Sequence, residues 1–257
     1  MNPILLNLGF IEIRWYSVLM LTAFIIGYLL IINRCKKLGI STTKISDLCF
    51  YLIIVCIIGA RLYYCLFNLD YYGKNIIDIF KIWEGGLAIH GGIIAGIIFI
   101  CFYIKKLDIP FLTILDIFAP ALVLGQAIGR WGNFFNSEAY GPVTSLTQLK
   151  QLGIPNFIID GMYIEHSYHH PTFLYESIGC IIVFIIIILI RNLKIIKKGQ
   201  ITAIYFIFYG VIRFFIESLR QDSLMFFDLK IAQIVSIIMI IIGLMLFVLP
   251  YIRRHND

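Results

Sequence analysis

The chain has 257 residues, of which 60% are hydrophobic and 14% are charged, and its formal net charge is +6. Soluble domains are typically about 25% charged, so this composition excludes an ordinary soluble protein and indicates a polytopic membrane protein. The basic residues stand in short clusters between apolar runs, which is typical of membrane topology and not of a surface that binds nucleic acid. The six cysteines are dispersed without a CxxC pair, so we predict neither a zinc site nor a disulfide framework.

Seven apolar segments are long enough to cross a bilayer as helices, which takes about 20 residues each. In chain order they are Tyr16–Ile32, Asp47–Phe67, Leu87–Ile104, Phe111–Phe135, Thr172–Ile190, Ile201–Leu219 and Ile231–Tyr251. We therefore expect an all-α, polytopic integral membrane protein with about seven transmembrane helices, organised as a single transmembrane domain over residues 1–257. The first segment carries its basic flank after the apolar run, so we do not expect a cleaved signal peptide.

Basic residues concentrate in alternate connections between these segments. Clusters follow the first, third, fifth and seventh segments, among them Arg34, Lys36, Lys37, Lys105, Lys106, Arg191, Lys194, Arg253 and Arg254. Cytoplasmic loops carry the excess of Lys and Arg, so we expect an outside N-terminus and a cytoplasmic C-terminus. The connection 137–171, which contains glycines, prolines and three histidines, is then expected to be a small, irregular external arm.

The fourth segment contains polar residues at helical spacing. On one face stand Gln126, Arg130 and Asn133, and one residue earlier a glycine stripe repeats the spacing with Gly125, Gly129 and Gly132. A charged side chain at the bilayer centre costs at least ~2.5–3.5 kcal/mol on insertion scales, so it usually faces a partner or a polar cavity. Small residues at this spacing let another helix approach closely. We therefore predict a polar site at a tight helix contact.

In the expected orientation the intramembrane cations lie in the outer leaflet. They are Arg61, His90, Arg130, Arg213 and Arg220, and Tyr209, Arg213, Glu217 and Arg220 share one helix face. Fewer carboxylates lie at that depth, namely Glu138 and Glu217, with Glu176 deeper, so we expect a pocket with surplus positive charge. The planar fork of arginine suits phosphate, and the natural anion there is a phospholipid head group. Arg220 lies near a helix end, where a side chain that reaches to the interface is an equal alternative.

The histidines suggest two further kinds of site. His90 stands between two glycine pairs that permit close backbone approach, and histidine is the side chain best placed to take a proton near neutral pH; a structural role is an equal alternative. The second set, His166, His169 and His170, does not have the H-E-x-x-H spacing, so we predict no metal site. We expect the His170 side chain to form a hydrogen bond with nearby backbone at the start of the fifth helix.

Residues 129–141, GRWGNFFNSEAYG, resemble the G-R-x-G-N-F-x-N-x-E-x-x-G signature of prolipoprotein diacylglyceryl transferases at every fixed position. Supporting pieces occur in the family's order: Arg14-Trp15-Tyr16, Gly59-Ala60-Arg61, His90-Gly91-Gly92, His170-Pro171-Thr172 with Tyr175-Glu176, and Tyr209–Arg213 with Glu217 and Arg220. The resemblance covers essentially the whole chain.

The resemblance implies transfer of the diacylglyceryl group of phosphatidylglycerol to the lipobox cysteine of a prolipoprotein signal peptide, with release of glycerol phosphate. It implies the first step of lipoprotein maturation, at the outer face of the bacterial cytoplasmic (inner) membrane, without metal or soluble cofactor. The family marks as functional the positions of Tyr16, His90, Arg130, Asn133, Gly141 and Arg213. We expect a monomer, with no nucleic acid as partner.

Our hypothesis for the catalytic residues is Arg130 and Arg213 on the departing phosphate, with His90 as general base or, alternatively, an arginine-assisted thiolate. We expect the remaining residues to bind substrate or line the site: Tyr16, Arg61, Asn133, Glu138, Gly141, Tyr209, Glu217 and Arg220.

Two other classes of function would fit parts of this pattern. A transporter or flippase for an anionic lipid would also place arginines in the outer leaflet, but it would need a second polar site deeper, where only Asp116 stands, and often a repeat. A scaffold protein would not carry this many costly polar groups at one depth.

Overall fold

The computed structural model describes residues 1–9, 12–107, 109–221, 223, 225–227 and 229–253. Within that part of the chain, seven helices are long and apolar enough to cross a membrane. They are α1 (Trp15–Lys37), α2 (Thr42–Leu66), α4 (Ile89–Tyr103, extended by η3, Ile104–Lys106), α5 (Phe111–Phe135), α8 (Thr172–Ile190), α9 (Gln200–Leu219) and α10 (Ile231–Arg253). Each predicted segment matches one of them with its ends shifted by a few residues, so the prediction of an all-α polytopic membrane protein is confirmed.

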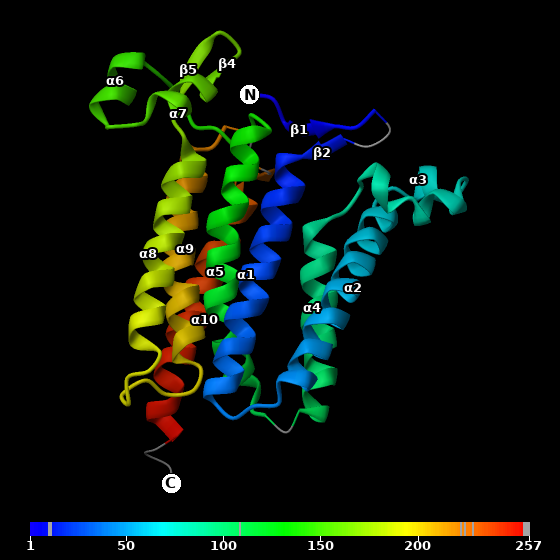
Figure 1. Cartoon of the computed structure of the whole chain (residues 1–257), viewed down its shortest axis with the longest axis vertical. Coiled ribbons are helices and arrows are strands. Elements are labelled where there is room, and N and C mark those ends of the chain that lie inside the picture. Colours follow the sequence, from blue (N-terminus) through cyan, green and yellow to red (C-terminus); the bar gives the residue numbers. More distant parts are fainter. Residues whose placement is uncertain (10–11, 108, 222, 224, 228, 254–257) are drawn as a thin grey trace. The chain divides into compact units, whose positions relative to one another are not determined.

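Short elements occupy the connections (Figure 1). They are β1 (Ile4–Asn7), β2 (Glu12–Arg14), α3 (Leu69–Tyr72), η1 (Ile76–Phe80), η2 (Ile82–Glu84), β3 (Val143–Thr144), α6 (Leu146–Gln151), α7 (Asn156–Gly161), β4 (Tyr163–Ile164), β5 (Ser167–His169), β6 (Met225–Phe226) and β7 (Leu229–Lys230). The strands form antiparallel pairs β1–β2 and β6–β7 and a three-stranded sheet in the order β3-β5-β4.

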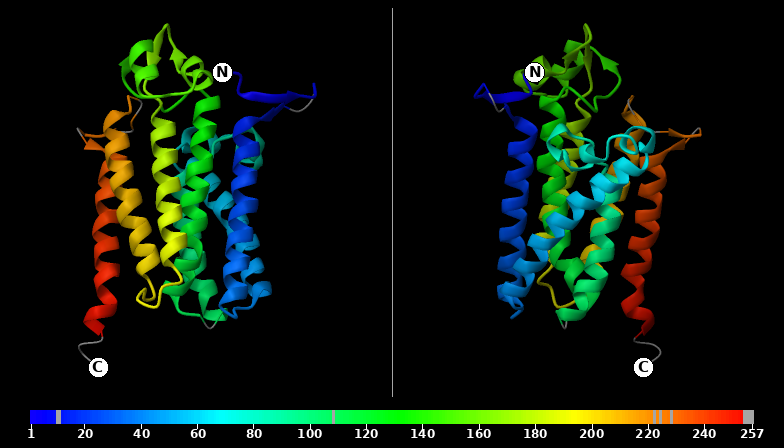
Figure 2. Two further views of the ribbon diagram at one scale, coloured as in Figure 1. Left: turned by 60° about the vertical axis from the view of Figure 1, so that its left-hand side comes forward. Right: turned by 90° about the vertical axis from the view of Figure 1, so that its right-hand side faces the viewer.

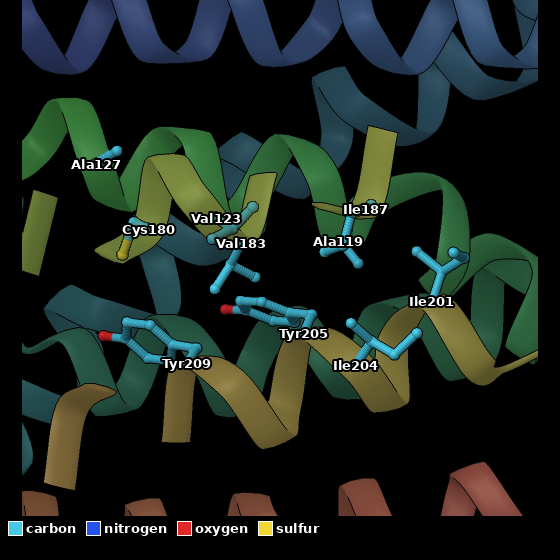
Figure 3. Close-up of a cluster of buried hydrophobic side chains, with 10 residues drawn as sticks. All are labelled: Ala119, Val123, Ala127, Cys180, Val183, Ile187, Ile201, Ile204, Tyr205 and Tyr209. Carbon is cyan, nitrogen blue, oxygen red and sulfur yellow. The ribbon is translucent and has the colours of Figure 1, made fainter. Parts of the chain in front are cut away.

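The chain divides into two compact units, one made of Met1–Ile31 with Leu115–Asp257 and the other of Ile32–Ile114. In the first unit α9 lies between α8 and α10 (Figure 2). Its core is a cluster of side chains from α5, α8 and α9 (Figure 3): Ala119, Val123, Ala127, Cys180, Val183, Ile187, Ile201, Ile204, Tyr205 and Tyr209. Since α9 is the most buried of the seven helices, polar groups on it are held between neighbours.

The glycine stripe of α5 faces α1 over part of its length. The Tyr16 ring covers Gly132 so closely that a Cβ there would overlap it, and a Cβ at Gly129 would lie 3.7 Å from Met20 Sδ. Near the end of α5, Trp15 stacks on Phe135 with ring centroids 4.6 Å apart. A Cβ at Gly125 would meet no described atom within 4 Å, so the predicted close contact involves two of the three glycines.

The segment 137–171 is more ordered than predicted. It contains α6, α7 and the small sheet, and Ile158 and Met162 pack against Phe134 of α5 and Phe173 of α8. Its two ends are joined because the Gly141 N–H donates to the His170 carbonyl at 2.9 Å. The expectation of an irregular arm was wrong because these apolar residues, spread between turns, form a core only after the chain has folded back.

In the second unit, α2 packs against α4 through glycine. A Cβ at Gly59 would lie 2.7 Å from the Gly91 carbonyl, and one at Gly91 would overlap the Gly59 carbonyl. The Ala88 N–H also donates to the Ala60 carbonyl at 3.0 Å. The glycines beside His90 therefore serve close helix packing, as expected for small residues between membrane helices.

Candidate active site

Glu176 of α8 bridges the two arginines singled out by the sequence. Arg130 Nη2 lies 2.8 Å from Glu176 Oε1, and Arg213 Nη1 lies 3.1 Å from Oε2 of the same carboxylate. The Tyr209 hydroxyl donates to Oε1 at 3.3 Å. Because the Glu176 side chain is only 2% exposed, this is a buried cluster of three helices around one carboxylate.

Arg213 also has a partner on its own helix. Glu217 Oε2 lies 2.6 Å from Arg213 Nη2, four residues along α9, as the i, i+4 spacing predicts. This oxygen has no hydrogen bond among the described residues, so the N–H is not aimed at it and the contact is an ion pair. Each guanidinium has five N–H donors, so the contacts described for Arg130 and Arg213 leave donors for a ligand.

A second line of polar contacts runs from Arg130 toward the end of α5. Arg130 Nη1 donates to Asn133 Oδ1 at 3.2 Å, and Asn133 Nδ2 donates to Glu138 Oε1 at 2.8 Å. Glu138 is brought back over the helix by a turn in which Ser137 and Ala139 have positive φ of 53° and 58°. Non-glycine residues adopt this conformation infrequently, and it tends to persist at functional sites. The strained turn thus holds Glu138 on Asn133.

The expected surplus of positive charge is not what this cluster contains. Arg130 and Arg213 face Glu176 and Glu217, so the formal charges of these four side chains cancel. Its position in the sequence predicts Glu176 to lie deeper than the arginines and outside the site. The arginine side chains nevertheless reach this carboxylate on a neighbouring helix, because each of them spans about a helical turn (~5.4 Å).

Other predicted residues of the first unit lie around this cluster. Tyr16 covers Gly132 and is 40% exposed, and Gly141 joins the two ends of the segment 137–171. Arg220 follows α9, and Lys230 Nζ donates to the Arg220 carbonyl at 2.8 Å and to the Glu217 carbonyl at 2.7 Å. A lysine on the last carbonyls of a helix stabilises its C-terminus, so Lys230 fixes the turn that carries Arg220.

Arg61 has an environment unlike that of the other arginines. In the second unit its guanidinium is buried and donates to five backbone carbonyls, those of Asp78, Ile79, Lys81, Gly85 and Gly86, at 2.5–3.2 Å. All five N–H donors are therefore engaged. The geometry favours Arg61 as the residue that holds the connection before α4, and not as a ligand for a phosphate.

The same connection is fixed from outside by Asp78. Its carboxylate lies 2.6 Å from Lys81 Nζ and accepts from the Tyr71 hydroxyl at 2.7 Å. These two partners hold the pKa of Asp78 below its ordinary value, because both stabilise the charged carboxylate. Beyond this connection, His90 stands exposed in the first turn of α4, with its ring 6.3 Å from the Tyr63 ring.

His169, His170 and Asp116 have structural partners. His169 Nδ1 lies 2.9 Å from the Gly141 carbonyl, and His170 Nδ1 lies 3.1 Å from the Tyr175 hydroxyl, so the ring that contacts backbone is His169 and not, as expected, His170. Among the described residues no group of three metal-ligating side chains occurs.

Asp116 accepts from the backbone N–H groups of Gly199 and Thr202 at 2.6 and 2.9 Å, and so caps the first turn of α9. This cap accounts for the deeper polar residue that a transporter would have required.

Comparison with known proteins agrees with this architecture. The family model described as prolipoprotein diacylglyceryl transferase matches residues 3–249. The chain is 46% identical over 256 residues to the phosphatidylglycerol–prolipoprotein diacylglyceryl transferase of Clostridium novyi, covering 100% of this chain and 98% of that protein. It is 42% identical over 257 residues to the protein of the same name from Ligilactobacillus salivarius, covering 100% and 94%. The chain belongs to the prolipoprotein diacylglyceryl transferase family.

This family member is therefore a multi-pass bacterial membrane protein, and the resemblance found in residues 129–141 is confirmed at the level of the family. Within the transferase family's signature, the structure accounts for the individual letters. Arg130 forms an ion pair with Glu176, and Asn133 links Arg130 to Glu138. Gly132 leaves room for the Tyr16 ring, and Gly141 closes the segment 137–171.

Proposed function

We propose that the chain transfers the diacylglyceryl group of phosphatidylglycerol to the thiol of a prolipoprotein's lipobox cysteine and releases glycerol phosphate. The observation that carries the proposal is the convergence of Arg130 and Arg213 on one carboxylate, 2.8 and 3.1 Å away. Two guanidiniums that can hold a carboxylate between them can hold a phosphate in the same place, since both anions accept the planar arginine fork.

In the proposed reaction the cysteine thiolate attacks the carbon of the diacylglyceryl group that is bonded to a phosphate oxygen. A C–S bond forms, the C–O bond to phosphate breaks, and the leaving glycerol phosphate takes the electron pair. Arg130 and Arg213 stabilise the charge that develops on that oxygen. Asn133, held by Glu138, orients Arg130 and the head group, while Glu217 and Tyr209 orient Arg213 and Glu176.

The thiol proton needs an acceptor, because a thiol of pKa ≈ 8.5 is mostly protonated at neutral pH. His90 takes it in our proposal, since this ring is exposed and imidazole is the side chain best suited to accept a proton near neutral pH. A cysteine ionised by the nearby arginines is the alternative. The pH profile of His90→Gln distinguishes them, because an unchanged profile rules out His90 as the base.

The proposal includes the setting of the reaction. The clusters of Lys and Arg favour an N-terminus outside and a C-terminus in the cytoplasm, in the cytoplasmic membrane. In that orientation the end of α5 and the segment 137–171 lie on the outer side, where exported prolipoproteins present their signal peptides. The enzyme acts as a single transmembrane domain and a monomer, and it needs no metal or soluble cofactor.

The test follows glycerol phosphate release by purified protein supplied with phosphatidylglycerol and a lipobox peptide. Arg130→Ala and Arg213→Ala should each lower the rate by about 10²–10³, the usual loss for a donor to a developing charge. Lys37→Ala is the matched control, since Lys37 is exposed at the last residue of α1, at the end of the helix away from Tyr16. Release that survives both variants contradicts the site, and an intact protein that releases nothing contradicts the function.

A further inference from the structure

One polar residue of the α5 face has no place in the arginine cluster. Gln126 stands one turn before Arg130 and donates from Nε2 to the Tyr205 hydroxyl at 2.9 Å. Its Oε1 is buried and has no hydrogen-bond partner among the residues that the structure describes. Buried acceptors nearly always have a partner, so an orphaned amide oxygen in a native site needs an explanation.

The Gln126–Tyr205 pair continues directly into the arginine cluster. Tyr205 stacks on Tyr209 one turn along α9, with ring centroids 5.8 Å apart and planes inclined by 22°. Figure 3 shows both rings lying along α9 on the side that faces Cys180 and Val183. The Tyr209 hydroxyl in turn donates to Glu176. Two hydrogen bonds, joined by this ring contact, therefore connect the Gln126 amide to Glu176 of the arginine cluster.

We propose that Gln126, oriented by Tyr205, hydrogen-bonds an ester carbonyl of the diacylglyceryl group of the donor lipid. This inference rests on the proposed function. In the proposed orientation Gln126 lies about 6 Å deeper than Arg130, at 1.5 Å per residue of helix. The ester carbonyls of a glycerophospholipid lie a few bonds below its phosphate, toward the acyl chains, so they reach the level of this amide.

The chemistry of the pair suits an acceptor. If the amide turns over, its Oε1 accepts from the Tyr205 hydroxyl and its two N–H donors become available, and the two amide orientations are nearly indistinguishable in shape. These N–H donors need a hydrogen-bond acceptor, and an ester carbonyl is a group that only accepts. The Gln126–Tyr205 pair then distinguishes lipids that carry ester carbonyls from ether lipids, which lack them, because an unpaired buried donor penalises the wrong ligand.

The experiment compares dipalmitoyl phosphatidylglycerol with its dihexadecyl ether analogue, in which the C–O bond to phosphate is unchanged. For the wild type we expect kcat/KM to be about tenfold higher with the diester, the worth of one hydrogen bond to a buried donor, with most of the difference in KM. Gln126→Met should lose that factor with the diester and reduce the preference toward one. Tyr205→Phe, which keeps the ring, should reduce it in the same direction.

The outcomes separate this inference from the proposed function. Gln151→Met, at an exposed residue of α6, is the control for handling and reconstitution. Equal wild-type use of both lipids overturns the inference and leaves the proposed function standing. An equal loss with both lipids in Gln126→Met and Tyr205→Phe also overturns it, since a trapped water or a packing role gives that result. An intact wild type that releases glycerol phosphate from neither lipid contradicts the proposed function and with it this inference.

Discussion

Replacing Glu176 by Gln should leave the positive charges of Arg130 and Arg213 without the carboxylate that now balances them. Its two oxygens lie 2.8 and 3.1 Å from Arg130 and Arg213. With charge centres about 4 Å apart, each pair is worth about 4 kcal/mol at an effective dielectric constant of about 20. Part of this lost attraction is offset in the variant, because a neutral glutamine avoids the cost of removing a charged carboxylate from water. Removing one partner of a buried ion pair costs about 3–5 kcal/mol in measured cases, and we expect a loss of unfolding free energy in that range.

An anionic lipid should restore part of that loss. Thermal unfolding of purified Glu176→Gln would be measured in detergent with added phosphatidylglycerol or zwitterionic phosphatidylcholine, since a ligand that binds the folded state stabilises it by mass action. We expect phosphatidylglycerol to raise the Tm of the variant more than that of the wild type, and phosphatidylcholine to raise both alike. Glu12→Gln, at an exposed position, is the control. A variant that is as stable as the wild type, or equal responses to the two lipids, would contradict the role of Glu176 as the anion that holds Arg130 and Arg213.

Four further substitutions test the packing of α5, the cap of α9 and the connection before α4. Gly132→Ala should cost about 1–3 kcal/mol because its Cβ overlaps the Tyr16 ring, whereas Gly125→Ala, with no described atom within 4 Å, should stay within about 0.5 kcal/mol; thermal unfolding checks both, and equal costs contradict the packing. Asp116→Ala should cost about 0.5–2 kcal/mol through the lost cap of α9, again by thermal unfolding, and no change would show that the cap is dispensable. Arg61→Lys leaves three N–H donors for five carbonyls, so protease should cleave the connection 74–88 faster in this variant. Unchanged cleavage would contradict the role of Arg61 in holding this connection.

The membrane helices could be predicted from the sequence because the bilayer requires long apolar runs, and each run here has clear polar ends. The pairing of Arg213 with Glu217 could also be predicted, since four residues along a helix bring two side chains together. Both are local properties of the chain, and both are present in the structure as expected.

The parts that could not be predicted depend on contacts between distant segments. Glu176 lies 46 residues from Arg130 in the sequence, and only the packing of α8 beside α5 and α9 brings its carboxylate to both arginines. The sequence predicts Arg61 to bind substrate, because it is a cation within a membrane segment. Its partners are instead carbonyls of a connection whose path the sequence does not define. In both cases the sequence located a costly charge correctly, and the fold determined which groups stabilise it.

The most direct test is a structure of the protein with phosphatidylglycerol bound, solved in a lipid nanodisc. We expect phosphate oxygens about 2.7–2.9 Å from guanidinium nitrogens of both Arg130 and Arg213, the usual length of a charged N–H···O⁻ bond, with the Glu176 bridge opened or shared. A head group bound elsewhere, with Arg130 and Arg213 still joined through Glu176 as they are now, would contradict the proposed phosphate site.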